Sequence, residues 1–142
     1  MKSLLIVALV GCAFVAVSAL IGETQSSGAR GKLTCNGKPA KSVTVKMYDE
    51  DDLDVDDFMG ETKTSGSGEY ELKGHTDEIT EIEPKINIYH DCEDELTPCQ
   101  RKITIKIPGS YITKGKSPKK FYDAGSIELS GKFPGESRDC LH

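Results

Sequence analysis

Two runs of alternating isoleucines, one on each side of a short acidic loop, constrain the fold of this chain most strongly. In residues 83–107 the isoleucines alternate with lysine, asparagine, tyrosine and threonine. Alternation of β-branched and polar residues with a period of two is typical of a half-buried strand. The loop carries a cysteine near each edge, Cys92 and Cys99. We therefore predict a hairpin of two strands whose inward residues are Ile86, Ile88, Ile103, Ile105 and Ile107.

Short strands with turn signals between them account for most of the remaining chain. In residues 42–49, Val43, Val45 and Met47 share one face. No segment shows a sustained helical period, although residues 77–82 leave room for a short helix. The strands predicted outside the hairpin cover residues 29–35, 42–49, 58–64, 69–72 and 121–130, with a hairpin turn at 65–68. This pattern predicts an all-β fold, a β-sandwich of about seven strands.

The N-terminal residues differ from the rest of the chain. Residues 1–19 combine Lys2, an apolar run and small residues before Ala19, which predicts a secretory signal peptide cut after Ala19. A membrane anchor and a lipid anchor at Cys12 are the alternatives. Residues 20–28 are polar and predict a flexible N-terminal arm, followed by one domain over residues 29–142. We therefore expect a secreted, extracellular protein that is not an integral membrane protein.

Charge and cysteine content narrow the class of protein further. The chain has a formal net charge of −5, which argues against nucleic-acid binding because phosphate contacts need a basic surface. Four cysteines outside the signal peptide predict two disulfides, with three connectivities open. We favour Cys92–Cys99, which would close the hairpin loop, and Cys35–Cys140, which would tie down the chain end. The alternative is a zinc site formed by His90 with Cys92 and Cys99, although their spacing fits no common zinc motif.

An acidic stretch at residues 49–57 raises the question of a cation site. Its sequence is DEDDLDVDD, and hard cations take clustered carboxylates. An EF-hand loop starting at Asp52 would need glycine at position six and glutamate at position twelve, where this chain has Asp57 and Lys63. We interpret the stretch as a solvated connection, with a weak cation site as the alternative. We predict no metal site and no cofactor.

The basic residues gather at one place in this acidic chain. The cluster KGKSPKK contains Lys114, Lys116, Lys119 and Lys120, which predict a surface for an anionic partner such as a lipid head group or a sulfated glycan. A solvated loop is the alternative. The three histidines, at positions 75, 90 and 142, lie near no recognisable nucleophile motif. We predict no catalytic residues.

Several longer motifs resemble a known family, the nematode transthyretin-like proteins. The motifs are GKLTCNGKP at 31–39, VKMYD at 45–49, NIYHDC at 87–92, PCQRK at 98–102 and GKFPGESRDC at 131–140. The resemblance implies a transthyretin-like β-sandwich, an extracellular location and a non-enzymatic role in binding or recognition. Its partner would be an extracellular protein or an anionic cell surface, which the protein could bridge to a receptor.

Two other functions are known among relatives of transthyretin. Transthyretin is a carrier of a small apolar ligand, which it binds in a channel between subunits. Another branch hydrolyses 5-hydroxyisourate and carries a C-terminal Tyr-Arg-Gly-Ser. This chain ends in Cys140-Leu141-His142, so the signature of the hydrolase is absent. We therefore expect a recognition protein first, a carrier second and a hydrolase last.

Overall fold

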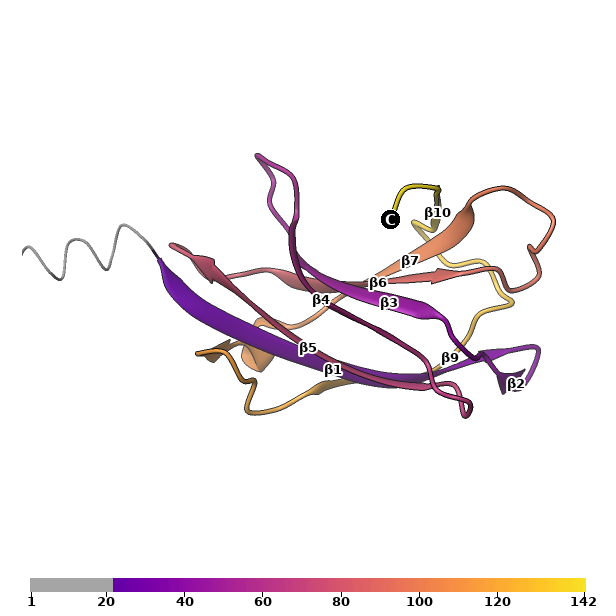
Figure 1. Ribbon diagram of the computed structural model, residues 1–142, viewed down its shortest axis with the longest axis horizontal. Helices are drawn as coiled ribbons and strands as arrows, with labels where there is room; N and C mark the ends of the chain where they lie inside the picture. The colour runs from indigo at the N-terminus through magenta and orange to yellow at the C-terminus, as the bar shows by residue number, and fades with distance from the viewer. Residues whose placement is uncertain (1–21) are drawn as a thin grey trace, which may run out of the picture.

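The protein folds into two packed β-sheets, which a computed structural model describes for residues 22–142 (Figure 1). The predicted signal peptide, residues 1–19, and the first two residues of the predicted arm lie outside the described residues. No helix within residues 22–142 is long and apolar enough to cross a membrane. The elements are β1 (Glu23–Cys35), β2 (Lys38–Pro39), β3 (Thr44–Asp49), β4 (Asp57–Lys63), β5 (Glu69–Glu78), β6 (Pro84–His90), β7 (Gln100–Lys106), η1 (Gly109–Tyr111), β8 (Thr113–Lys114), β9 (Tyr122–Glu128) and β10 (Ser137–Asp139).

The first sheet is organised around β1. Antiparallel β5 pairs with β1 over ten residue pairs, and β2 pairs with the end of β1. Antiparallel β8 and parallel β9 pair with different parts of β1. The second sheet is antiparallel, in the order β10-β7-β6-β3-β4. This architecture confirms the predicted all-β sandwich, and β6 and β7 form the predicted hairpin.

The core lies between the sheets and consists of the inward residues of the alternating strands. Val45, Met47, Ile86 and Ile88 are fully buried on the second sheet, and Leu33 faces them from the first. Period-two alternation predicts this face correctly because adjacent side chains of a strand point to opposite sides of the sheet. Residues 58–64 are predicted as an edge strand, and β4 lies at the edge of its sheet.

The predicted flexible arm is wrong for residues 23–28, because β1 begins at Glu23. Ser26 and Ser27 are fully buried, and their hydroxyl groups donate to the carbonyls of Thr113 and Tyr111 at 3.4 and 3.3 Å. Gln25 donates to the carbonyl of Thr80 at 2.8 Å. Buried polar groups are tolerated when they are hydrogen-bonded, so a polar sequence does not by itself mean an exposed arm.

Two local predictions are also corrected. Residues 77–82 form no helix; β5 runs to Glu78, and a loop that bends at residues 79 and 80 follows it. The turn at residues 65–68 exists, and the Gly68 amide donates to the Ser65 carbonyl at 3.0 Å. However, it joins β4 of one sheet to β5 of the other, so it is not the turn of a paired hairpin.

The predicted disulfide pairing is wrong, although all four cysteines are in disulfides. Cys35 is bonded to Cys92, and Cys99 is bonded to Cys140. The first bond joins the end of β1 to the chain just after β6, so it links the two sheets. The second bond is explained by the position of β10, a strand that is absent from the sequence-based prediction. Asp139 of β10 pairs with Gln100 of β7, which brings the neighbouring Cys140 and Cys99 together.

Candidate binding surfaces

The loop from Lys114 to Lys120, here called the lysine loop, begins at the edge of the first sheet. Thr113 and Lys114 pair with β1, and the Gly115 amide donates to the Thr24 carbonyl at 2.9 Å. The Lys119 amide donates to the Thr113 hydroxyl at 3.1 Å, which closes the loop. Backbone amides at both ends of the loop are therefore held by hydrogen bonds, and no lysine side chain takes part in these bonds.

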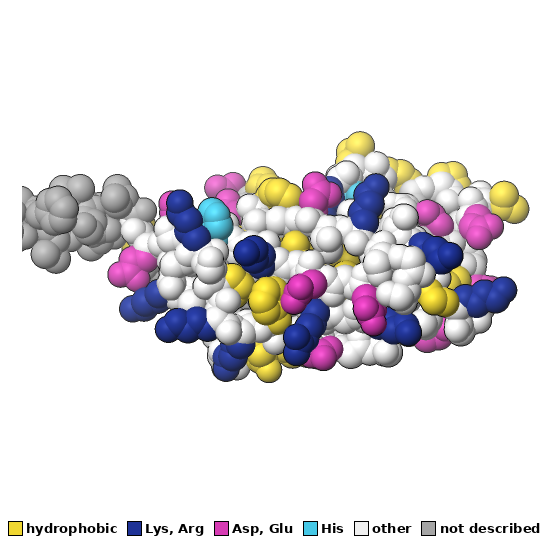
Figure 2. All heavy atoms as spheres, turned by 60° about the horizontal axis from the view of Figure 1, so that its bottom comes forward, with side chains coloured by type: hydrophobic (Ala, Val, Ile, Leu, Met, Phe, Trp, Pro, Cys, Tyr) yellow, Lys and Arg dark blue, Asp and Glu magenta, His cyan; other side chains and the backbone are white. Residues whose placement is uncertain are grey.

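All four predicted lysines are exposed on this loop. Lys114 lies 3.9 Å from Glu23, but both side chains are largely exposed, so this ion pair is weak. The ammonium of Lys120 lies 4.8 Å from the centre of the Tyr111 ring, a cation–π distance. In Figure 2 basic side chains lie along the whole of the face formed by the first sheet, including its left end, where Figure 1 places this loop. The structure thus places the four predicted residues on one exposed surface.

The loop between β6 and β7 is the second predicted surface. Leu96 at its tip is fully exposed, and Asn36 donates to Glu93 at 2.6 Å. Arg138 forms an ion pair with Asp94, and the hydrogen bonds it donates lower the pKa of the Asp94 carboxyl. Both disulfides anchor this loop, one at each end, although they do not close it on itself as predicted.

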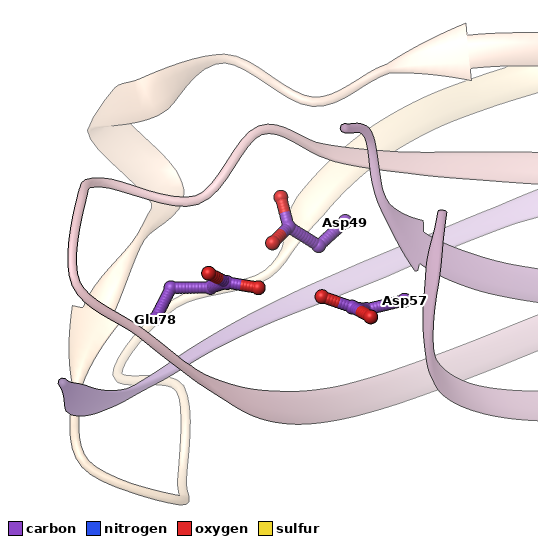
Figure 3. Close-up of side chains that lie close together, drawn as sticks. All are labelled: Asp49, Asp57 and Glu78. Carbon is purple, nitrogen blue, oxygen red and sulfur yellow. The ribbon is translucent and has the colours of Figure 1, made fainter. Parts of the chain in front are cut away.

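Three carboxylates from different strands meet at one end of the sandwich (Figure 3). Asp49 ends β3, Asp57 begins β4 opposite to it, and Glu78 ends β5. One carboxylate oxygen of each lies within 4.8 Å of the others. The predicted acidic stretch supplies Asp49 and Asp57. Sequence reasoning misses Glu78 because it comes from the other sheet, and only the packing of the two sheets brings it close.

Ionising all three of these side chains at neutral pH would cost free energy, because three negative charges would lie close together. A hydrogen bond with Asp57, burial and the nearby Asp49 raise the pKa of Glu78 to about 7. Asp49 is buried, which raises its pKa, although the Glu83 amide donates to it at 2.8 Å. A Ca²⁺ ion takes six to eight oxygen ligands, so backbone carbonyls and water would have to supply the ligands that these three carboxylates do not. We interpret the cluster as carboxylates that share protons.

The rest of the acidic stretch is only partly solvated. Lys85 lies 2.6 Å from Asp56 and 3.6 Å from Glu50, and Lys106 lies 3.3 Å from Glu50. Leu53 and Val55 at the tip of the loop are almost completely exposed. In Figure 1 this loop, between β3 and β4, stands off the sandwich.

The three histidines lie in separate environments. His75 is exposed on β5. His90 is buried, its Nδ1 accepts from the Cys92 amide at 3.1 Å, and burial lowers its pKa, so it is neutral. His142 stacks on Tyr89 with ring centres 4.0 Å apart. The zinc alternative fails because Cys92 and Cys99 are in disulfides.

The sequence of this chain is similar to that of other known proteins. A family model described as the transthyretin-like family (TTR-52) matches residues 30–108. Transthyretin-like protein 5 of Caenorhabditis elegans is 59% identical over the full length of both chains. Transthyretin-like protein 2 of the same organism is 47% identical, also over the full length of both. Transthyretin-like protein 33 is 48% identical over 84% of each chain.

Similarity to solved structures is weaker. The match to a 9R-lipoxygenase from Cyanothece covers 74% of this chain and 16% of the lipoxygenase chain, at 18% identity and a TM-score of 0.43. A match at that level supports no inference about activity. The family model and the full-length relatives, together with the two-sheet fold, agree with the resemblance found in the motifs. This chain belongs to the transthyretin-like family.

Proposed function

We propose that this protein is an extracellular, non-enzymatic recognition protein that binds an anionic membrane surface through the lysine loop. The observation that carries the proposal is the gathering of Lys114, Lys116, Lys119 and Lys120 on one anchored, exposed loop of an acidic protein. Each lysine near an anionic lipid surface contributes about 1 kcal/mol of attraction. The two disulfides fit an oxidising compartment, which supports the extracellular location.

The arrangement of charge supports binding in one orientation. The lysine loop extends from the first sheet, whereas the acidic loop between β3 and β4 extends from the second (Figure 1). An anionic surface attracts the first loop and repels the second. A molecule bound in this way would hold Leu53, Val55 and the second sheet away from the membrane, where a receptor could reach them.

Vesicle binding tests this proposal. The variant with all four lysines of the loop replaced by serine should bind vesicles containing phosphatidylserine about 100- to 1,000-fold more weakly than the unmodified protein. Its binding should also depend less on salt, because fewer charge contacts are screened. Co-sedimentation or surface plasmon resonance at several salt concentrations measures both effects.

A matched control distinguishes the effect of the lysine loop on binding from the effect of net charge. Lys38, Lys41, Lys63 and Lys132 are also exposed but lie outside the lysine loop; the first three lie near the opposite end of the sandwich, around the end of β1 and the end of β4. Replacing these four with serine changes the net charge equally and should weaken binding far less. Equal losses in the two variants, or no binding to anionic vesicles by the unmodified protein, would rule out the lysine loop as the membrane site.

A further inference from the structure

Two large apolar side chains, Leu53 and Val55, lie at the tip of the acidic loop, residues 50–56 between β3 and β4. Leu53 is 98% exposed and Val55 is 83% exposed. Figure 1 shows this loop standing off the sandwich, so neither sheet covers its tip. A single exposed apolar residue needs no explanation, but two together on a projecting loop present apolar surface that a partner can bury.

The base of the acidic loop is fixed to the second sheet, although its tip is free. The Lys85 ammonium lies 2.6 Å from the Asp56 carboxylate and 3.6 Å from the Glu50 carboxylate. The Lys106 ammonium lies 3.3 Å from Glu50, and the Asp51 amide donates to the Asp56 carboxylate across the loop at 3.0 Å. A loop held in this way loses less conformational freedom on binding than a free chain does, so its tip is suited to recognition.

The tip also carries negative charge that is not neutralised within residues 22–142. The ion pairs of the acidic loop involve only its two basal carboxylates, those that Lys85 and Lys106 contact. Asp51, Asp52 and Asp54 are exposed and form no ion pair in the described part of the chain. The two apolar side chains therefore lie among three free carboxylates, which attract cationic groups on a partner and repel anionic ones.

This combination selects among the classes of partner. An anionic membrane and a nucleic acid would both be repelled by the three carboxylates. A second copy of the chain is disfavoured, because each copy has a formal net charge of −5. A small cation would leave the apolar side chains exposed to water. A protein surface with basic residues around an apolar pocket accommodates both the charges and the apolar tip.

We propose that the acidic loop is a docking surface for a second protein, whose basic residues surround an apolar pocket that takes Leu53 and Val55. Arginine suits this role best, because its guanidinium can pair with both oxygens of a carboxylate. Burial of the two apolar side chains supplies affinity, and the free charges speed association and favour the correct partner. The acidic loop shares no residue with the lysine loop, so each can be tested without the other.

Selection from a phage library of random, disulfide-closed peptides tests the proposal. The library is depleted on the variant Leu53→Ser with Val55→Ser and then selected on the oxidised, unmodified protein. We expect the selected peptides to combine arginine or lysine with large apolar residues. A synthetic copy should shift the amide signals of residues 51–56 in nuclear magnetic resonance spectra, with a Kd of about 100 μM or tighter. Acidic or wholly polar peptides, or no peptide that depends on the tip, would overturn the proposal.

Single substitutions show whether each apolar side chain makes contacts. Leu53→Ala and Val55→Ala should each weaken binding of the selected peptide about 3- to 10-fold, because less apolar surface is removed from water. Leu96→Ala is the matched control, since Leu96 is fully exposed on the loop between β6 and β7. If the control loses as much affinity as the two variants, or if neither variant loses any, the tip is not the contact.

The three free carboxylates are tested at several salt concentrations. Replacing Asp51, Asp52 and Asp54 with asparagine should weaken peptide binding about 10-fold or more at low salt and should flatten its salt dependence. The matched control replaces three exposed glutamates of β4 and β5 with glutamine: Glu61, Glu69 and Glu71. The control has the same net charge as the asparagine variant and should bind more tightly than that variant. Equal losses would show that net charge attracts the peptide and would overturn the assignment to the loop.

The variant without the four lysines of the lysine loop separates this proposal from membrane binding. It should bind the selected peptide at least as tightly as the unmodified protein does, whether or not it still binds vesicles. A loss of peptide binding in that variant would place the contact on the lysine loop and overturn the proposal.

Discussion

Arg101, at the start of β7, holds the C-terminal tail against the second sheet. Its Nε and Nη2 atoms donate to the two carboxylate oxygens of Glu136 at 3.0 and 2.7 Å. It also donates to the carbonyls of Cys92 and Gly131 at 2.9 and 2.6 Å. The Arg101 and Glu136 side chains are both more than nine-tenths buried. A buried ion pair with this many hydrogen bonds makes each partner depend on the other.

Replacing Arg101 with methionine should therefore destabilise the protein by about 3–5 kcal/mol, because Glu136 would be left buried and unpaired. The double variant Arg101→Met with Glu136→Gln should lose less stability, because no unpaired charge remains buried. Chemical denaturation of the oxidised proteins measures both values. A loss below about 1 kcal/mol in the single variant would show that the pair contributes no more than a surface ion pair.

Glu78 makes stability depend on pH near neutrality. Its pKa in the folded state is about 7, whereas the ordinary pKa of a glutamate is 4.5. The stability that this group contributes is complete below pH 4.5 and is lost as the pH rises through about 7. Glu78→Gln should raise the melting temperature at pH 8 by about 2–4 °C and change it little at pH 5.

The matched control for this measurement is Glu61→Gln, which removes the same charge from an exposed position on β4. The control should shift the melting temperature equally at pH 5 and pH 8. If Glu78→Gln also shifts it equally at the two pH values, the three carboxylates do not share protons as the geometry indicates. Differential scanning calorimetry in matched buffers gives both comparisons.

Among the elements, short β10 determines how the cysteines pair. Without β10, the sequence gives no reason to place residue 140 beside residue 99, and closure of the short 92–99 loop looks favourable. When β10 pairs with β7, Cys140 lies beside Cys99 and can bond to it. Cys92 then bonds to Cys35. A strand of three residues carries too little alternation to be predicted from its sequence.

The two disulfides should differ in what they stabilise. Cys35–Cys92 joins the sheets, so replacing both cysteines with serine should cost about 4 kcal/mol of global stability. Cys99–Cys140 ties the tail to β7, so its removal should speed amide exchange mainly in residues 131–142. Peptide mapping without reduction should recover Cys35 with Cys92 and Cys99 with Cys140. A Cys92–Cys99 peptide would contradict the structure.

Long alternating strands can be predicted from the sequence, and sites that depend on packing cannot. Residues 42–49 and the β6–β7 hairpin follow from period two, because one buried face fixes which residues point inward. Glu78 carries no local signal, since it meets Asp49 and Asp57 only where the two sheets pack together. The lysine loop is predictable because four lysines in seven residues are visible without any fold.

The whole molecule separates its charged features between its two layers. The lysine loop belongs to the first sheet, and the acidic loop belongs to the second. A protein bound to a membrane by its lysines would therefore hold its acidic loop away from the head groups.

The order of the disulfides has a consequence for how the chain matures. Along the chain, the first of the four cysteines is bonded to the second and the third to the fourth. When a chain enters an oxidising compartment from its N-terminus, Cys35 and its correct partner Cys92 both emerge before Cys99 and well before Cys140. Each bond can close in the order of emergence, and no earlier bond must be broken to allow a later one. Such a chain should reach its native pairing with little help from a disulfide isomerase.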